Sequence, residues 1–152
     1  MKKKVLLAAA ALALILYFRP LPFPELSYDA DGTLCVKKVD LSLIAGDLDM
    51  DSTMYVFSDG SPEAEAIEEV LERYSYRRSL RTPFPGTDLV GNAAGFWLHM
   101  WGGDFYFSSG GTGEINLNDH VYRMGWSGNQ KNIALMAEIS ALLMEAEPYS
   151  GS

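Results

Sequence analysis

The sequence is poor in the residues that form disulfides and metal sites. It has 152 residues with one cysteine and two histidines. A single cysteine, Cys35, excludes a disulfide within the chain, and we interpret it as a small, buried strand residue. Zinc needs three or four ligands, and neither His99 nor His120 has a partner histidine at helical or hairpin spacing. We therefore predict neither a metal nor another cofactor.

Basic residues are scarce beyond the N-terminal segment. Residues 1–24 hold four of the twelve Lys and Arg residues and none of the twenty Asp and Glu residues. The remainder has eight basic and twenty acidic residues, a formal charge of −12. Because an acidic domain is repelled by nucleic acid and by anionic lipid surfaces, we expect neither as a partner.

The one long apolar run is short for a membrane span. It extends from Val5 to Phe18, after three lysines and before Arg19 and a proline-rich stretch. A helix of this length covers roughly 21 Å, whereas the hydrocarbon core is ~30 Å thick. Length favours a cleaved secretory signal, but every small-x-small cleavage site lies inside the run, which favours an uncleaved anchor. Both interpretations place the remaining chain outside the cytoplasm, either anchored through residues 5–18 or secreted.

We divide the chain into three parts on this basis. Residues 1–24 are expected to be a signal anchor or signal peptide with a proline-rich spacer. Residues 25–148 are predicted to form a single α+β domain, and residues 149–152 a polar tail.

The first amphipathic segment follows the acidic N-terminal half of this domain. Ser61 and Pro62 open it, with serine as the N-cap and proline at the first helical position. We expect Arg73, Arg77 and Arg78 to close this helix, because cations stabilise the carbonyl end.

The remaining pattern is mostly strand-like. A leucine-rich stripe predicts a second helix over 127–145. Alternating segments predict strands at 33–44 and 53–58, with an acidic turn at 46–51, and four consecutive strands within 96–126. The order β-β-β-α-β-β-β-β-α predicts an antiparallel sheet of about five to seven strands with both helices packed on one face.

Alternation in the last four strands separates two faces. One is apolar and should face the helices; it comprises Phe96, Leu98, Met100, Phe105, Phe107, Ile115 and Leu117. The opposite face is the predicted ligand-binding site, formed by Trp97, His99, Trp101, Tyr106, Asn116 and Arg123, with Asn118, Tyr55 and Phe57 as further candidates. Contiguous aromatic side chains with amides beside them suit sugar rings or a protein partner. The alternative is that the loop 82–95 and the N-terminal hairpin cover this face as a second small core.

A second candidate site is the only basic cluster of the acidic domain. It comprises Arg77, Arg78 and Arg81, with Arg73 one helical turn earlier. These residues either balance the end of the first helix or bind an anion, such as a carboxylate or a wall phosphate, with their guanidinium groups.

Three short motifs resemble catalytic or metal-binding sequences. The DxDGTL sequence at 29–34 matches the nucleophile motif of haloacid-dehalogenase-type phosphatases, but no parallel β-α alternation surrounds it, so we interpret it as a turn. Alternate aspartates at 47–51 have the spacing of a calcium loop without its glycine and glutamate. His99 could approach Asp104 across the GGD turn at 102–104, and this pair is the remaining catalytic candidate, with Ser108 or Ser109 as nucleophile.

Several local features between residues 52 and 146 together form a pattern. Pro62-Glu63 opens a helix, Tyr76–Leu80 follows it, and a strand with Tyr122-Arg123 precedes a final leucine-rich helix. In these features the chain resembles small, uncharacterised extracytoplasmic α+β domains of Gram-positive, often gut-dwelling, bacteria. The resemblance implies location and fold and supplies no catalytic residues.

We predict a non-enzymatic extracytoplasmic binding module that presents its aromatic and polar sheet face to a cell-envelope component, a cell-wall glycan or an envelope protein. One alternative is an accessory subunit that docks a membrane protein partner. The other is a small hydrolase that uses His99 and Asp104.

Overall fold

The computed structural model describes residues 2–86, 92–126 and 128–150. Within these residues the helices are α1 (Lys2–Tyr17), α2 (Pro62–Glu72) and α3 (Gln130–Glu145). The strands are β1 (Pro20–Pro22), β2 (Thr33–Ile44), β3 (Asp47–Ser58), β4 (Ser75–Arg78), β5 (Phe96–Gly102), β6 (Phe105–Ser109), β7 (Glu114–Leu117) and β8 (His120–Arg123).

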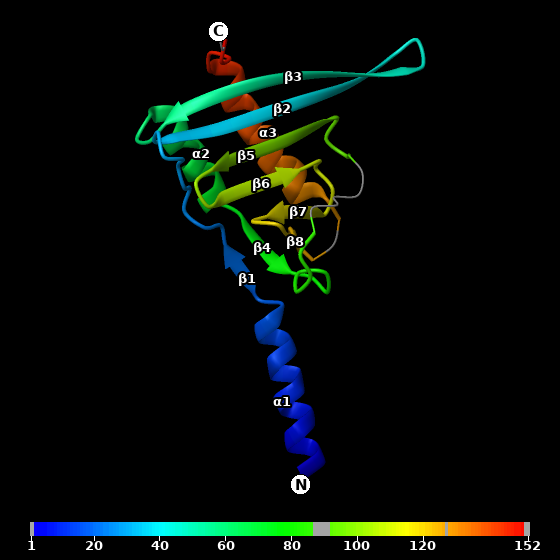
Figure 1. The fold of residues 1–152 in the computed structure, drawn as a ribbon. Coiled ribbons are helices and arrows are strands. Elements are labelled where there is room, and N and C mark those ends of the chain that lie inside the picture. Colours follow the sequence, from blue (N-terminus) through cyan, green and yellow to red (C-terminus); the bar gives the residue numbers. More distant parts are fainter. Residues whose placement is uncertain (1, 87–91, 127, 151–152) are drawn as a thin grey trace.

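The strands form one antiparallel sheet in the order β1-β4-β8-β7-β6-β5-β2-β3, which confirms the predicted α+β class. Helices α2 and α3 lie against one face of this sheet, and α1 projects from the end where β1 and β4 lie (Figure 1). The described sheet has eight strands, more than the five to seven that we predicted. The element order also differs, because α1 and β1 precede the domain and β4 follows α2.

Helix α2 begins as predicted and ends earlier. The Ala64 N–H donates to Ser61 Oγ over 3.3 Å, and the first helical residue is proline. The helix ends at Glu72, so the prediction that Arg77 and Arg78 close it is wrong. Both arginines lie on β4, whose backbone pairs with β1 on one side and β8 on the other. Partners distant in the sequence therefore override the local helical tendency.

The hairpin of β2 and β3 is longer than predicted. Ala45 and Gly46 alone make the turn, with φ of 54° and 95°, and pairing starts at Ile44 and Asp47. Two residues at positive φ give a turn whose twist matches that of the flanking strands. The predicted acidic turn at 46–51 is therefore wrong beyond Gly46, and its aspartates lie on β3.

The hairpin of β2 and β3 also extends beyond the end of β5, its neighbour in the sheet. The pairing of β2 with β5 ends at Asp40 and Phe96, so residues 41–51 extend as a two-stranded arm. This arm is the projecting end of β2 and β3 in Figure 1.

The core lies between the sheet and the two helices, as the alternation predicted. Of the predicted inward-facing residues, six are at most 3% exposed: Leu98, Met100, Phe105, Phe107, Ile115 and Leu117. Phe96 packs partly buried against the same cluster. Tyr55 and Phe57, candidates for the opposite face, are core residues because β3 places them opposite Val36 and Leu34.

The N-terminal segment is connected to the domain by specific contacts. The Tyr17 hydroxyl at the end of α1 donates to the Ser79 carbonyl over 3.0 Å. After β1, the Phe23 ring contacts Tyr76 edge-on and Phe107, so the proline-rich stretch contributes to the core. None of the described helices combines the length and the apolarity that a membrane crossing requires.

Candidate functional site

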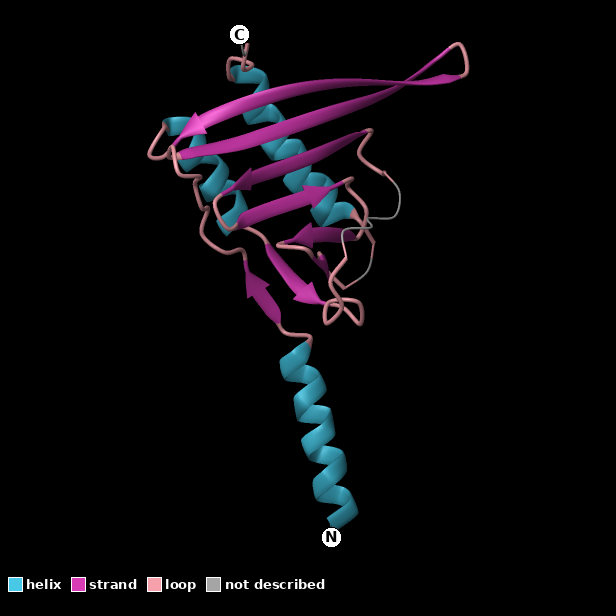
Figure 2. Cartoon of the chain, viewed as in Figure 1, coloured by secondary structure: helices cyan, strands magenta, loops and turns pink. Residues whose placement is uncertain are grey.

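Four of the six predicted ligand-binding residues lie together on the sheet face opposite the helices. Trp97, His99 and Trp101 alternate along β5, and Tyr106 of β6 is the direct cross-strand neighbour of Trp101. All four side chains are half-buried, and we call them the aromatic face. Figure 2 shows α2 and α3 behind the sheet, so no described helix covers these rows.

Strand β2 completes the surroundings of the aromatic face. Lys37 lies opposite His99, and Val39 lies opposite Trp97. Partial burial lowers the pKa of His99 below its ordinary value, and the charge of Lys37 lowers it further. The imidazole is therefore largely neutral near pH 7, able both to donate and to accept a hydrogen bond.

Asn116 lies on the same sheet face but is not available to a ligand. Its side chain is fully buried, and Nδ2 donates to the Gly86 carbonyl over 3.1 Å. Its Oδ1 has no hydrogen-bond partner among the residues that the structure describes. Residues 79–86 after β4 thus cover the β7–β8 part of this face. Residues 87–91 of the predicted covering loop lie outside the described residues.

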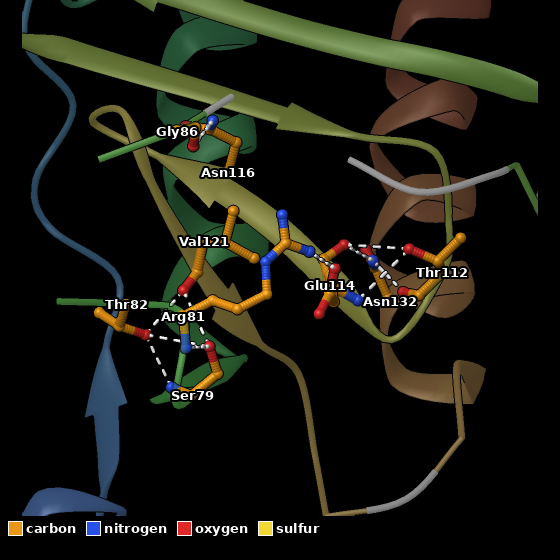
Figure 3. A network of polar contacts seen from close by, with 9 residues as sticks. All are labelled: Ser79, Arg81, Thr82, Gly86, Thr112, Glu114, Asn116, Val121 and Asn132. Carbon is orange, nitrogen blue, oxygen red and sulfur yellow. Dashed lines mark hydrogen bonds and ion pairs between the residues drawn. The ribbon is translucent and has the colours of Figure 1, made fainter. Parts of the chain in front are cut away.

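A hydrogen-bonded turn attaches this covering segment to β8 (Figure 3). The Thr82 hydroxyl donates to the Val121 carbonyl over 2.6 Å, and the Ser79 N–H donates to Thr82 Oγ1 over 2.7 Å. The Arg81 N–H donates to Ser79 Oγ over 3.1 Å. These bonds fix the backbone of Arg81 beside β7, where its Nη1 pairs with Glu114 Oε2 at 2.8 Å.

The predicted anion-binding residues converge on a pocket of about 420 Å³ beside the end of α1. We call it the arginine pocket, and its charged and aromatic lining consists of Arg77, Arg78, Arg81, Arg123, Glu114, Phe18 and Trp126. Arg123, which we predicted as part of the aromatic face, belongs here instead. It lies directly opposite Arg77 in the pairing of β4 with β8.

Neighbouring groups hold Arg77 and Arg78 in place, as Glu114 does for Arg81. Arg77 Nη1 donates to the Phe18 carbonyl over 3.1 Å, and its guanidinium carbon lies 4.2 Å from the Trp126 ring centre. The guanidinium carbon of Arg78 lies 5.6 Å from the ring centre of Tyr17. The side chain of Arg123 is exposed, and its guanidinium group makes no hydrogen bond or ion pair with any part of the chain that the structure describes.

The structure does not bring His99 and Asp104 together. Asp104 lies at the tip of the β5–β6 turn, and its backbone N–H donates to Ser27 Oγ over 3.2 Å. His99 is three residues before the end of β5, roughly 10 Å along the strand from that tip. Nor do the described residues contain any group of three His, Cys, Asp or Glu side chains that could hold a metal ion.

Two important residues were missed. Trp126 is 73% exposed just after β8, where we expected only the end of a strand. Asn132 is fully buried in the apolar stripe of α3 and connects this helix to the β6–β7 loop and to the start of β7 (Figure 3). A polar residue within a leucine-rich stripe was the signal that could have identified Asn132.

Comparison with protein-family models, with curated proteins and with solved structures finds no match for this chain.

Proposed function

We propose that the protein is a non-enzymatic binding module that contacts a cell-envelope component through the aromatic face. The observation that carries this proposal is the placement of Trp97, His99, Trp101 and Tyr106 in two adjoining rows. Both helices pack on the other side of the sheet, so these rings are half-exposed although they are large.

The chemistry of this face suits the ring of a sugar. Tryptophan and tyrosine offer flat apolar surfaces with a polar atom at one end. The neutral imidazole of His99 and the cation of Lys37 add hydrogen-bond donors and an acceptor beside the rings. With Asn116 buried, these two side chains take the polar role that we first gave to the amide. We therefore favour a cell-wall glycan, bound outside the cytoplasm by a chain that is tethered or secreted.

Co-sedimentation of the detergent-solubilised full chain with purified cell-wall material tests this proposal. The wild type should sediment with the wall, and a Trp97→Ala/Trp101→Ala variant of unchanged thermal stability should remain in the supernatant. Trp126→Ala is the matched control, because it removes an exposed tryptophan outside the aromatic face. Failure of the wild type to sediment, or equal loss in both variants, would contradict glycan binding by this face.

A second candidate, docking of a membrane protein partner, is favoured by the arm of residues 41–51. Leu43 and Leu48 are cross-strand neighbours and are 76% and 59% exposed. Their alternation with Val39 places them on the same sheet face as Trp97. Contiguous exposed apolar residues are typical of surfaces that contact another protein or a membrane.

The two candidates differ in the residues that they require. A partner that co-purifies from solubilised envelope membranes should be lost with Leu43→Thr/Leu48→Thr and retained with Trp97→Ala/Trp101→Ala if the arm docks it. Threonine keeps the strand tendency of the hairpin while it removes the apolar surface. Retention in the arm variant would contradict docking through the arm.

A further inference from the structure

Half of the basic residues of the domain lie together at one end. Beyond residue 24 the chain carries a formal charge of −12, yet four of its eight basic residues line the arginine pocket. Among the described lining residues only Glu114 opposes them. The local charge at this end is therefore opposite to the mean charge of the domain, and it fits an anion.

The arginines are arranged for a group with several oxygen atoms. Arg77 and Arg123 are direct neighbours on adjacent strands, which places their Cα atoms about 5 Å apart. The Trp126 ring and the Phe18 carbonyl hold Arg77 in place, whereas the guanidinium group of Arg123 makes no hydrogen bond or ion pair with the described residues. One oriented and one unpaired guanidinium within reach of each other suit a phosphate group.

Exposed apolar side chains surround this basic pocket. Leu80 and Trp126 line it and are 79% and 73% exposed. Phe84, 70% exposed, lines the neighbouring pocket that shares Arg81. A soluble phosphate needs no such surroundings, whereas arginine beside exposed tryptophan, phenylalanine and leucine is the composition that binds at the boundary of headgroups and acyl chains.

The position of the pocket also favours contact with a lipid surface. Its lining includes Phe18 and residues of β4 and β8. It therefore lies at the base of the domain, by which we mean the end from which α1 projects (Figure 1). A second cavity of about 440 Å³ joins Leu14 and Ile15 of α1 to Phe18, Arg77 and Trp126. Because the arginine pocket adjoins the apolar helix α1, a bilayer that contacts one of them would also contact the other.

We propose that the base of the domain is a docking surface for anionic phospholipid headgroups. The arginine pocket binds the lipid phosphate, and Leu80, Phe84 and Trp126 enter the interfacial layer around it. This surface is distinct from the aromatic face, so an experiment can refute lipid docking without refuting glycan binding, and the reverse. It also departs from our expectation that an acidic domain avoids anionic lipid, because Glu114 is the only acidic residue among the described residues that line the pocket.

Trp126 is a built-in probe for this docking. The chain has three tryptophans, so a Trp97→Phe/Trp101→Phe variant leaves Trp126 as the only one. The full chain is reconstituted into phosphatidylcholine vesicles with increasing fractions of phosphatidylglycerol, at about 50 mM salt. Trp126 emission should shift to the blue, and brominated lipid should quench it, more strongly as the anionic fraction rises. About 0.5 M salt should weaken this effect, because screening shortens the reach of exposed charges.

Charge-matched variants separate the pocket from the overall charge. Arg123→Gln should lower the association constant from the phosphatidylglycerol titration about fivefold, the effect of one arginine near an anionic surface. Arg73→Gln is the control, because Arg73 pairs with Glu138 outside the pocket and the substitution removes the same charge. Equal effects of the two variants, or quenching that does not depend on phosphatidylglycerol, would overturn the proposal.

Soluble phosphate is the competing ligand. The detergent-solubilised chain is titrated with inorganic phosphate at up to about 10 mM, against sodium chloride of equal ionic strength. A saturable change in Trp126 emission without vesicles would overturn lipid docking in favour of a soluble phosphate site. If the Trp97→Phe/Trp101→Phe variant does not fold, the difference between the wild type and Trp126→Phe in each vesicle preparation gives the same readout.

Discussion

Replacement of Asn132 tests whether one buried amide connects α3 to the sheet. The Ser109 hydroxyl donates to its Oδ1 over 3.0 Å, and its Nδ2 donates to the Glu114 carbonyl over 3.1 Å and to the Thr112 carbonyl. The side chain is fully buried, so water cannot replace these partners in the folded state. Asn132→Leu keeps the volume of the side chain and removes all three hydrogen bonds.

The expected loss of unfolding free energy follows from the number of these bonds. At about 1 kcal/mol for each bond, three bonds amount to roughly 3 kcal/mol, and buried carbonyls left without donors add to this. Total stabilities of about 5–15 kcal/mol make such a loss easy to detect. Urea unfolding of the full chain in a mild non-ionic detergent, followed by far-ultraviolet circular dichroism, measures it.

The matched control is Asn129→Ala at the start of the same helix. Asn129 occupies the N-cap position but makes no capping hydrogen bond through its side chain. We therefore expect its replacement to change the unfolding free energy by less than about 0.5 kcal/mol. A loss below about 1 kcal/mol in Asn132→Leu, or equal losses in both variants, would refute the connection that we describe.

Three further predictions rest on local geometry. Gly102→Ala should destabilise the domain by about 1–3 kcal/mol, because the new methyl group would lie 2.5 Å from a backbone oxygen, whereas Gly86→Ala meets no atom within 4 Å and should be neutral in thermal unfolding. The pKa of Tyr74 should lie near 12 because of burial and its hydrogen bond to a carboxylate, and spectrophotometric titration against Tyr74→Phe would contradict this with a midpoint near 10. The pKa of His99 is lower in the folded chain than its unfolded value of 6.5, so the unfolded state binds more protons below that pH, and stability should be complete above pH 6.5 and fall as the pH drops below it. Proton NMR titration should show a His99 midpoint below 6.5 that rises in Lys37→Met, and an unchanged midpoint would remove the lysine as a cause.

The parts of the fold that could be predicted are those whose signal is local. Leu98 and Met100 alternate with larger polar or amphipathic residues, and period two indicates both a strand and its buried face. Ser61 and Pro62 mark the start of α2 because the capping geometry depends on adjacent residues only. Such features need no knowledge of distant partners.

Strand β4 could not be predicted, because distant segments define it. Ser75–Arg78 has four residues, two of them arginine, directly after a helix with glutamates. Its strand conformation depends on pairing with Pro20–Pro22 and with Arg77's neighbour Arg123. Neither partner is visible in a local window, so the end of a helix was the simpler interpretation.

The proposed docking to lipid depends on local charge and not on the composition of the whole domain. A formal charge of −12 describes the mean field of residues 25–152, which governs long-range steering. Contact with a membrane is decided within about 10 Å, the distance over which salt screens exposed charges. Once β4 and β8 place Arg77 beside Arg123, the base carries its own positive field, and the acidic strands of the arm project from another part of the sheet. Under this proposal, a domain that is repelled as a whole orients one end toward an anionic surface and leaves the aromatic face free.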